Sequence, residues 1–483
     1  MGVRPPTVQT SSMEETHERE RPFLWTTVVL LASAPLVALL CLTLWRMPFP
    51  ISEAVAIFED IANQPPTRFL IPDTSYYRPL FHMTVSAIWH NAGSLEAALS
   101  GVKLLHIVPI ALLVMLLIWH LRPRTMTDAA AASAAVAVLV GSPGFRDNLE
   151  LPLSYTIVGM PLAVAVWMLL TSERRAWHQP LIVLLALAAI GFKEQGLVLV
   201  PLVVAAWWTR APGASGATAA TLVVMTGAYL VMRVAWSESW PMFEQAIGLG
   251  FGEMEPPEAI ARYGSFPYFL YAYSGASTIA NVLFAEPTRG TFSIVRALVD
   301  GHPQPWQLVY LGSSAALTAV IAWWGIGSTT QAARSGWSPD ARLSVALALV
   351  LLASAALSFN YSRDRLGGMA VPFYAIAAFH ALRAAADRAW TAPRVRFAVA
   401  AAALILIAAG WQIRAVGTLE RTRLTSFRNH MEWLVLLPDR RMEFAERRTY
   451  LRIMESMIDQ GTRPAMPQPT RYPRAMSRWI GDL

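Results

Sequence analysis

The chain has 483 residues, of which 55% are hydrophobic and only 15% are charged. A soluble domain carries about 25% charged residues, so this composition excludes an ordinary soluble enzyme and indicates a chain built for lipid. The formal net charge of +7 comes from arginine, because lysine occurs only at positions 103 and 193, and no basic stripe with interleaved aromatic residues indicates a nucleic-acid partner.

Apolar runs recur along nearly the whole chain after a charged N-terminal segment, residues 1–22, which does not resemble a cleavable signal peptide. Runs of about 17–25 residues are long enough to cross a bilayer, and in lipid such a run must be helical to satisfy its own backbone. The predicted spans are 23–45, 103–120, 127–141, 153–171, 178–192, 194–209, 215–236, 306–325, 341–359, 368–384 and 397–413. The fold class is therefore all-α: a polytopic membrane protein with about eleven transmembrane helices.

The arginines near the span ends predict the orientation, because cytoplasmic loops are enriched in Lys and Arg. With the N-terminus in the cytoplasm, the loops that fall inside carry Arg122 and Arg124, Arg174 and Arg175, Arg210, Arg334 and Arg342, and Arg383 through Arg396. The segments that fall outside are a large first loop at 46–102, a hairpin tip at 192–196, a long loop at 237–305, and 360–367. We expect a multi-pass protein of the inner (plasma) membrane.

Three segments fit this scheme less directly. Residues 79–90 are too short and too polar at their ends to span, and we interpret them as an interfacial helix. Segment 264–285 is aromatic and almost long enough to cross, but a span there would invert every later loop, so we interpret it as interfacial or re-entrant. After a membrane domain at 23–414, residues 415–483 are predicted to form a small soluble helical tail outside, although its arginines strain the positive-inside rule.

Ionisable residues gather in the predicted outside segments. Lys193 and Glu194 are adjacent at the tip of a tight apolar hairpin, where a charge at bilayer depth costs about 2.5–3.5 kcal/mol or more. The pair either caps the hairpin by snorkelling or faces a phosphate. Arg363 and Arg365 lie in an outside loop, which is normally poor in arginine. They bind either lipid headgroups or the phosphate of a substrate, since the guanidinium fork matches phosphate oxygens.

The carboxylates of the first outside loop are candidate catalytic groups. Glu53 follows the first span by a few residues, where a carboxylate can act as general base on a hydroxyl. Asp73 precedes the run Tyr76-Tyr77-Arg78-Pro79-Leu80, in which Arg78 either binds phosphate or pins the loop. The alternative for each acid is an exposed loop charge. Two carboxylates are too few to claim a divalent cation site, so we assign no metal and no cofactor.

These residues resemble those of the GT-C membrane glycosyltransferases, and most closely the protein O-mannosyltransferase group and its bacterial relatives. The similar pieces are Ile51-Ser52-Glu53 after the first span, the run ending at Arg78-Pro79-Leu80, and the hairpin Lys193-Glu194-Gln195-Gly196. The layout of about eleven spans with a large first outside loop is also similar. The chain departs from the group in having one acid where two are frequent, and in having no TPR repeats after the spans.

The resemblance implies transfer of a sugar from a polyprenyl-phosphate donor to a lipid, glycan or protein acceptor on the extracytoplasmic face, with inversion. It implies that Glu53 accepts the proton of the acceptor. It also implies that the leaving phosphate is stabilised by Arg363, Arg365 and Lys193. Asp73 and Arg78 shape the pocket, while Glu194 orients Lys193. Two alternatives remain. A transporter or lipid flippase usually shows internal repeats and mid-membrane charges, and a non-catalytic membrane subunit would tolerate loss of Glu53.

Overall fold

The structure is a computed structural model of the full chain. It describes residues 23–50, 64–70, 77–150, 155–236, 247–249, 252–254, 257, 261, 268–288, 290–358 and 361–431. Glu53 and Asp73 lie outside these ranges.

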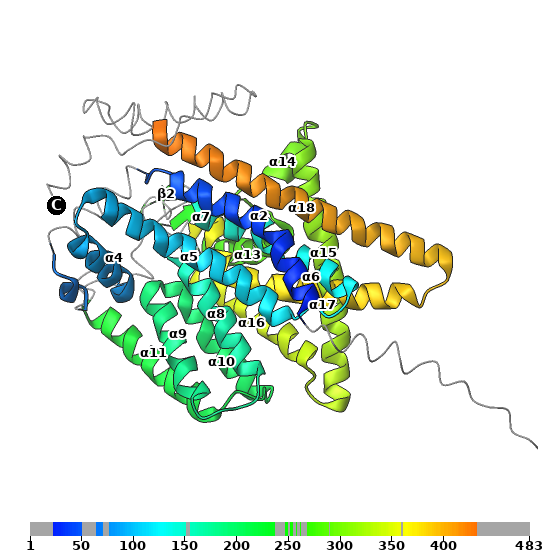
Figure 1. The fold of residues 1–483 in the computed structure, drawn as a ribbon, viewed down its shortest axis with the longest axis horizontal. Coiled ribbons are helices and arrows are strands. Elements are labelled where there is room, and N and C mark those ends of the chain that lie inside the picture. The colour runs from blue at the N-terminus through cyan, green and yellow to red at the C-terminus, as the bar shows by residue number, and fades with distance from the viewer. Residues whose placement is uncertain are drawn as a thin grey trace, which may run out of the picture.

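The described chain is nearly all helical (Figure 1). Its helices before the long loop are α2 (Leu24–Arg46), η1 (Pro66–Leu70), α4 (Pro79–Asn91), α5 (Leu95–Leu121), α6 (Met126–Gly141), α7 (Pro143–Glu150), α8 (Thr156–Thr171), α9 (His178–Phe192), η2 (Glu194–Val198), α10 (Leu199–Trp208) and α11 (Gly216–Trp236). Those after it are α13 (Tyr268–Phe284), α14 (Ser293–Val299), α15 (Pro305–Ser335), α16 (Pro339–Leu357), η3 (Asp364–Ala370), α17 (Val371–Trp390) and α18 (Arg394–Met431).

One small sheet accompanies the helices, which the all-α prediction did not include. Strand β1 (Ile247–Leu249) pairs antiparallel with β2 (Gly252–Met254) and parallel with β3 (Tyr361–Ser362). The sheet therefore joins a part of the long loop to the segment just before Arg363. It depends on pairing between residues far apart in the sequence, which hydropathy does not reveal.

The prediction of a multi-pass helical membrane protein is confirmed. Seven helices of the described chain are long and apolar enough to cross a membrane, or eight if α6 and α7, bent by 50°, form one broken span. Helices α8, α9 and η2–α10 are apolar but shorter. Each predicted span coincides with a helix or with a helix and its adjoining 3-10 turn, while the count of about eleven crossings stays a prediction.

Apolar side chains cover the outside of the bundle as well as its interior. Leu31 on α2, Ile326 on α15 and Leu406 on α18 are 68%, 67% and 72% exposed. Such side chains would be unfavourable in water, and they suit contact with lipid tails. Figure 1 shows α2, α5 and α18 running side by side along one face of the molecule.

The centre of the bundle is built on α6, whose alanine-rich sequence is buried almost throughout. Helices α2, α17 and α18 all pack against it. Small side chains let helix backbones approach closely, which is the usual way that membrane helices associate. The sequence of α6 therefore explains why it is surrounded on several sides.

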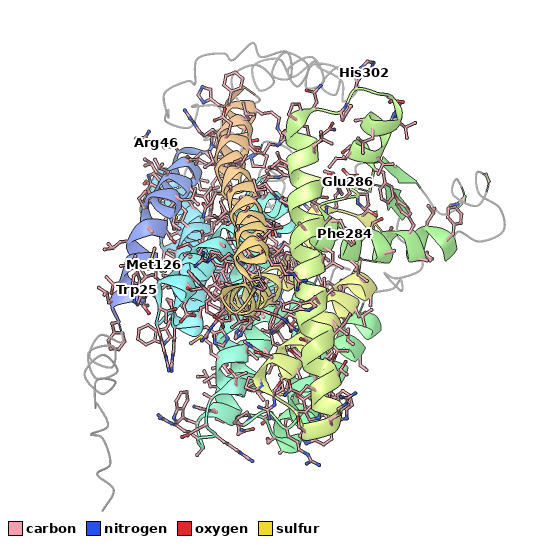
Figure 2. The ribbon with its side chains drawn as sticks, turned by 90° about the vertical axis from the view of Figure 1, so that its right-hand side faces the viewer. Trp25, Arg46, Met126, Phe284, Glu286 and His302 are labelled. Atoms are coloured by element: carbon pink, nitrogen blue, oxygen red, sulfur yellow. The ribbon has the colours of Figure 1, made fainter. Side chains whose placement is uncertain are left out.

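Arginines of the predicted inside loops make contacts within the bundle. Arg383 pairs with Asp128 at 3.0 Å and the Arg342 Nε donates to the Thr209 carbonyl at 3.1 Å. Figure 2 shows Arg46 and His302 in the upper part of the view, with Trp25 and Met126 below Arg46 on the left.

The structure bears on two further segments, the aromatic segment 264–285 and the chain after residue 414. Helix α13 is not among the candidate spans, and Figure 2 shows it, near Phe284, running across α15 rather than along it. Helix α18 runs unbroken across the boundary predicted at 414–415 and ends at Met431, while the predicted soluble tail stays a prediction. The distal part of α18 packs on the bundle: Thr418 Oγ1 donates to the Val140 carbonyl at 2.8 Å, and Asn429 Nδ2 to the Pro48 carbonyl at 2.9 Å.

Replacing Gly196 by alanine is expected to lower stability by about 1–3 kcal/mol, because a Cβ there would collide with the backbone of Ala189 and Ile190. The matched control is Gly227→Ala on α11, where a Cβ meets nothing within 4 Å. The melting temperatures of both variants are measured by heating them in detergent and monitoring the loss of monodisperse protein. Equal melting temperatures for the two variants would contradict the close packing at η2.

Candidate functional site

The tip of the α9–η2 hairpin holds two charged residues of the candidate site. Helix α9 ends at Phe192, Lys193 takes an extended backbone with φ −160° and ψ 144°, and η2 begins at Glu194. The turn is closed by the N–H of Gly196, which donates to the Lys193 carbonyl at 2.8 Å. Although it carries a charge, Lys193 is only 8% exposed. A buried lysine of this kind requires polar surroundings.

Glu194, the residue next to Lys193, is the centre of a network of charges. The Arg78 Nε donates to both of its carboxylate oxygens, at 3.0 and 3.1 Å, from 116 positions earlier in the chain. The Arg233 Nη2 on α11 lies 3.5 Å from the same carboxylate. All three side chains are less than one-fifth exposed. In such a dry setting, opposite charges interact far more strongly than on an open surface.

Aromatic rings surround this charge network. The ring of Tyr155 lies under two cations, 5.5 Å from the Arg78 guanidinium carbon and 5.9 Å from the Lys193 Nζ. Tyr77 stacks on Tyr229 with 5.9 Å between ring centroids, and the Tyr229 hydroxyl donates to the Tyr77 carbonyl at 2.9 Å. Burial raises the pKa of Tyr77, so its hydroxyl stays protonated. The Tyr155 ring helps to hold the two cations in place by cation–π attraction.

The second group of predicted residues lies on the segment that leads into η3. Arg363 has an extended backbone, and Asp364 begins the 3-10 turn. The Asp364 Oδ1 accepts a hydrogen bond from Asn281 Nδ2 on α13 at 3.1 Å, and the same amide reaches the Pro287 carbonyl at 2.9 Å. The segment with Arg363 and Arg365 is therefore tied to α13 as well as to the small sheet.

The first turn of α8 joins the two groups. The Thr156 hydroxyl donates to the side chain of Gln195 on η2. On its other side, Thr156 packs so closely on η3 that a Cβ at Gly368 would lie 3.2 Å from its methyl carbon. Helices η2 and η3 are also in contact with each other. Lys193 and Arg365 thus belong to neighbouring segments of the bundle.

The structure brings Arg78, Lys193 and Glu194 into one network and places Arg363 and Arg365 on the adjoining segment. The hydrogen bonds of Glu194 go to Arg78, so orienting Arg78 is a clearer role for Glu194 than the predicted one of orienting Lys193. Glu53 and Asp73 lie outside the described residues. Within the described ranges, no group of three or more His, Cys, Asp or Glu side chains is placed to hold a metal ion.

Sequence reasoning missed two contributors. Arg233 was passed over, although an arginine near the predicted outer end of a span departs from the positive-inside rule and was a usable signal. Helix α7 was missed as a whole, because its residues fell between two predicted spans. It carries Arg146, whose Nη1 donates to the Tyr310 hydroxyl at 3.3 Å, and Glu150, which pairs with Arg421 at 3.0 Å.

Replacing Glu194 by glutamine is expected to destabilise the protein by about 3–5 kcal/mol, because Arg78 and Arg233 lose a buried counter-charge. The control is Glu420→Gln, whose ion pair with Arg423 is far more exposed and should contribute less than about 1 kcal/mol. Both are measured as melting temperatures in the same detergent. A similar small shift for the two variants would show that the Glu194 network is dispensable.

No family model matches the chain, and no curated protein matches it. Among solved structures, the chain is similar to the crystal structure of ArnT from Cupriavidus metallidurans bound to undecaprenyl phosphate. The TM-score is 0.44 with 13% sequence identity, over 94% of this chain and 85% of that one. A likeness at this level carries no argument about the reaction, so the resemblance to the O-mannosyltransferase group stays a prediction.

Proposed function

We propose that this protein is a membrane glycosyltransferase of the GT-C type, which moves a sugar from a polyprenyl-phosphate donor to a lipid, glycan or protein acceptor on the extracytoplasmic face. The observation that supports this most is the cluster of Arg78, Lys193 and Arg233 around Glu194 at one end of an apolar helical bundle, with Arg365 on the adjoining segment. Cations held at the end of lipid-embedded helices suit a ligand with an anionic head and an apolar tail.

The chemistry of such a transfer needs fixed positive charge. When the bond between the sugar carbon and the phosphate oxygen breaks, the oxygen keeps the electron pair and negative charge develops on the lipid phosphate. Donors already held in place stabilise that charge without reorganising, and this is usually the largest catalytic contribution. Lys193, Arg363 and Arg365 are assigned this role, and the proposal needs no metal or cofactor because they supply the positive charge themselves.

The acceptor hydroxyl must lose its proton as its oxygen attacks the sugar carbon. We assign this proton to Glu53, the general base, and assign Asp73 to the same pocket. Attack from the side opposite the leaving phosphate inverts the sugar carbon. The products are the glycosylated acceptor and the free polyprenyl phosphate, whose tail remains in the bilayer.

The experiment that tests the function compares cells with and without the gene. Mass spectrometry of total glycolipids and glycoproteins should show one sugar modification that disappears on deletion and returns with the unaltered gene. A complemented strain with Glu53→Gln should fail to restore it. Restoration by that variant would favour a non-catalytic subunit, and accumulation of an unchanged sugar-lipid on the cytoplasmic side would favour a flippase.

A further inference from the structure

Both backbone polar groups of Arg365 are held by consecutive side chains of α7. The Asp147 Oδ2 accepts a hydrogen bond from the Arg365 N–H at 3.0 Å. The Asn148 Nδ2 donates to the Arg365 carbonyl at 3.2 Å and also to the Gly144 carbonyl, one helical turn back, at 2.6 Å. Asp147 and Asn148 are 8% and 0% exposed. These contacts, between positions more than two hundred residues apart, fix the peptide groups on both sides of the Arg365 Cα.

Two glycines allow this close approach. A Cβ at Gly144 would lie 3.2 Å from the Asp364 carbonyl oxygen and 3.3 Å from the Gly368 nitrogen. A Cβ at Gly368 would press on the Asn148 amide itself. The backbones of α7 and η3 are thus nearly in contact at this point, which leaves Arg365 little freedom to shift.

Helix α7 is itself held firmly. It leaves α6 at a bend of 50°, and all of its residues except Arg146 are buried. Glu150 at its end pairs with Arg421 on α18 at 3.0 Å, and Arg146 donates to Tyr310 on α15. A helix that orients a functional residue must itself be rigid. The contacts of Glu150 and Arg146 make α7 rigid in this way.

We infer that Asp147 and Asn148 are positioning residues, which act through Arg365 by holding its backbone so that its guanidinium faces the lipid phosphate. The inference rests on the proposed function. An arginine side chain has many rotamers, and ordering it on binding costs free energy. A fixed backbone leaves only the side chain to be ordered, because the Cα position and the direction of the Cα–Cβ bond are already set.

The first test needs no ligand. Hydrogen exchange of the peptide covering residues 361–368 is measured by mass spectrometry on the whole protein in nanodiscs. Asp147→Leu should speed exchange at the Arg365 amide, whereas Asp147→Asn, which keeps an acceptor oxygen, should leave it close to the unaltered protein. Unchanged exchange in Asp147→Leu, or equally fast exchange in both variants, would show that Asp147 does not hold the Arg365 backbone.

The second test measures binding of decaprenyl monophosphate to the same nanodiscs. Asp147→Leu should weaken binding about tenfold, Asp147→Asn should rescue it, and the exposed control Asp300→Leu should have no effect. The double variant Asp147→Leu/Arg365→Ala should bind no more weakly than Arg365→Ala alone, because a positioning residue has nothing left to position. Additive losses would overturn the inference while leaving the proposed function standing. An unaltered protein that failed to bind, with the exchange result intact, would instead overturn the proposed function and the phosphate-facing role of Arg365 with it.

Discussion

Glu53→Gln is expected to abolish sugar transfer, with a rate about 10²–10⁴-fold lower, because the amide cannot take the acceptor's proton. The side chain keeps its size, so expression, melting temperature and binding of decaprenyl monophosphate should stay unchanged. Transfer is measured with purified protein in nanodiscs, once the deletion experiment has identified the sugar. The loss should appear in kcat rather than in the donor KM, since a general base acts in the transition state.

The control for Glu53 lies in the same loop. Glu59 and Asp60 follow Glu53 at a helical spacing. This pattern is typical of the solvated face of a helix. Glu59→Gln should therefore retain nearly full transfer. Full activity of Glu53→Gln would remove Glu53 from the mechanism, and equal loss in both variants would indicate a general need for acidic charge in the loop.

Arg365→Ala is expected to lower kcat/KM for the polyprenyl-phosphate donor by about 10²–10³-fold, the usual cost of removing one fixed donor from a developing anion. Its backbone is held by α7, so the substitution removes the side chain without releasing the segment. Arg365→Lys should recover only part of the activity, because an ammonium lacks the planar fork that meets two phosphate oxygens.

The matched control for Arg365 is Arg334→Ala. Arg334 is exposed in the last turn of α15. The sequence predicts that this part of the chain is cytoplasmic. The loss of Arg334 should leave kcat/KM within about fivefold, because a surface charge near the membrane contributes only about 1 kcal/mol of lipid attraction. Equal effects of the two substitutions would mean that both arginines serve general lipid binding and that Arg365 has no special place in transfer.

The sequence by itself determined the helical membrane class and the position of the helices that coincide with the predicted spans. Helix α9 ends at Phe192 and α2 begins at Leu24, both within a residue of the predicted limits, and α4 was expected as a short helix of its own. This works because lipid forces every backbone group to be satisfied within its own segment. Length and apolarity are local properties of the chain, and they can be read from it directly.

Only the tertiary structure decided which charges meet. The pairing of Arg78 with Glu194, the arrival of Arg233 at the same carboxylate and the hold of Asp147 on Arg365 all join residues distant in sequence. It also decided that α18 continues past residue 414, because its distal half is packed against α6 and the start of the first loop. Hydropathy indicates whether a segment prefers lipid or water, but it does not identify the segment that packs against it. An ion pair, or a side chain that holds a distant backbone, exists only through its partner.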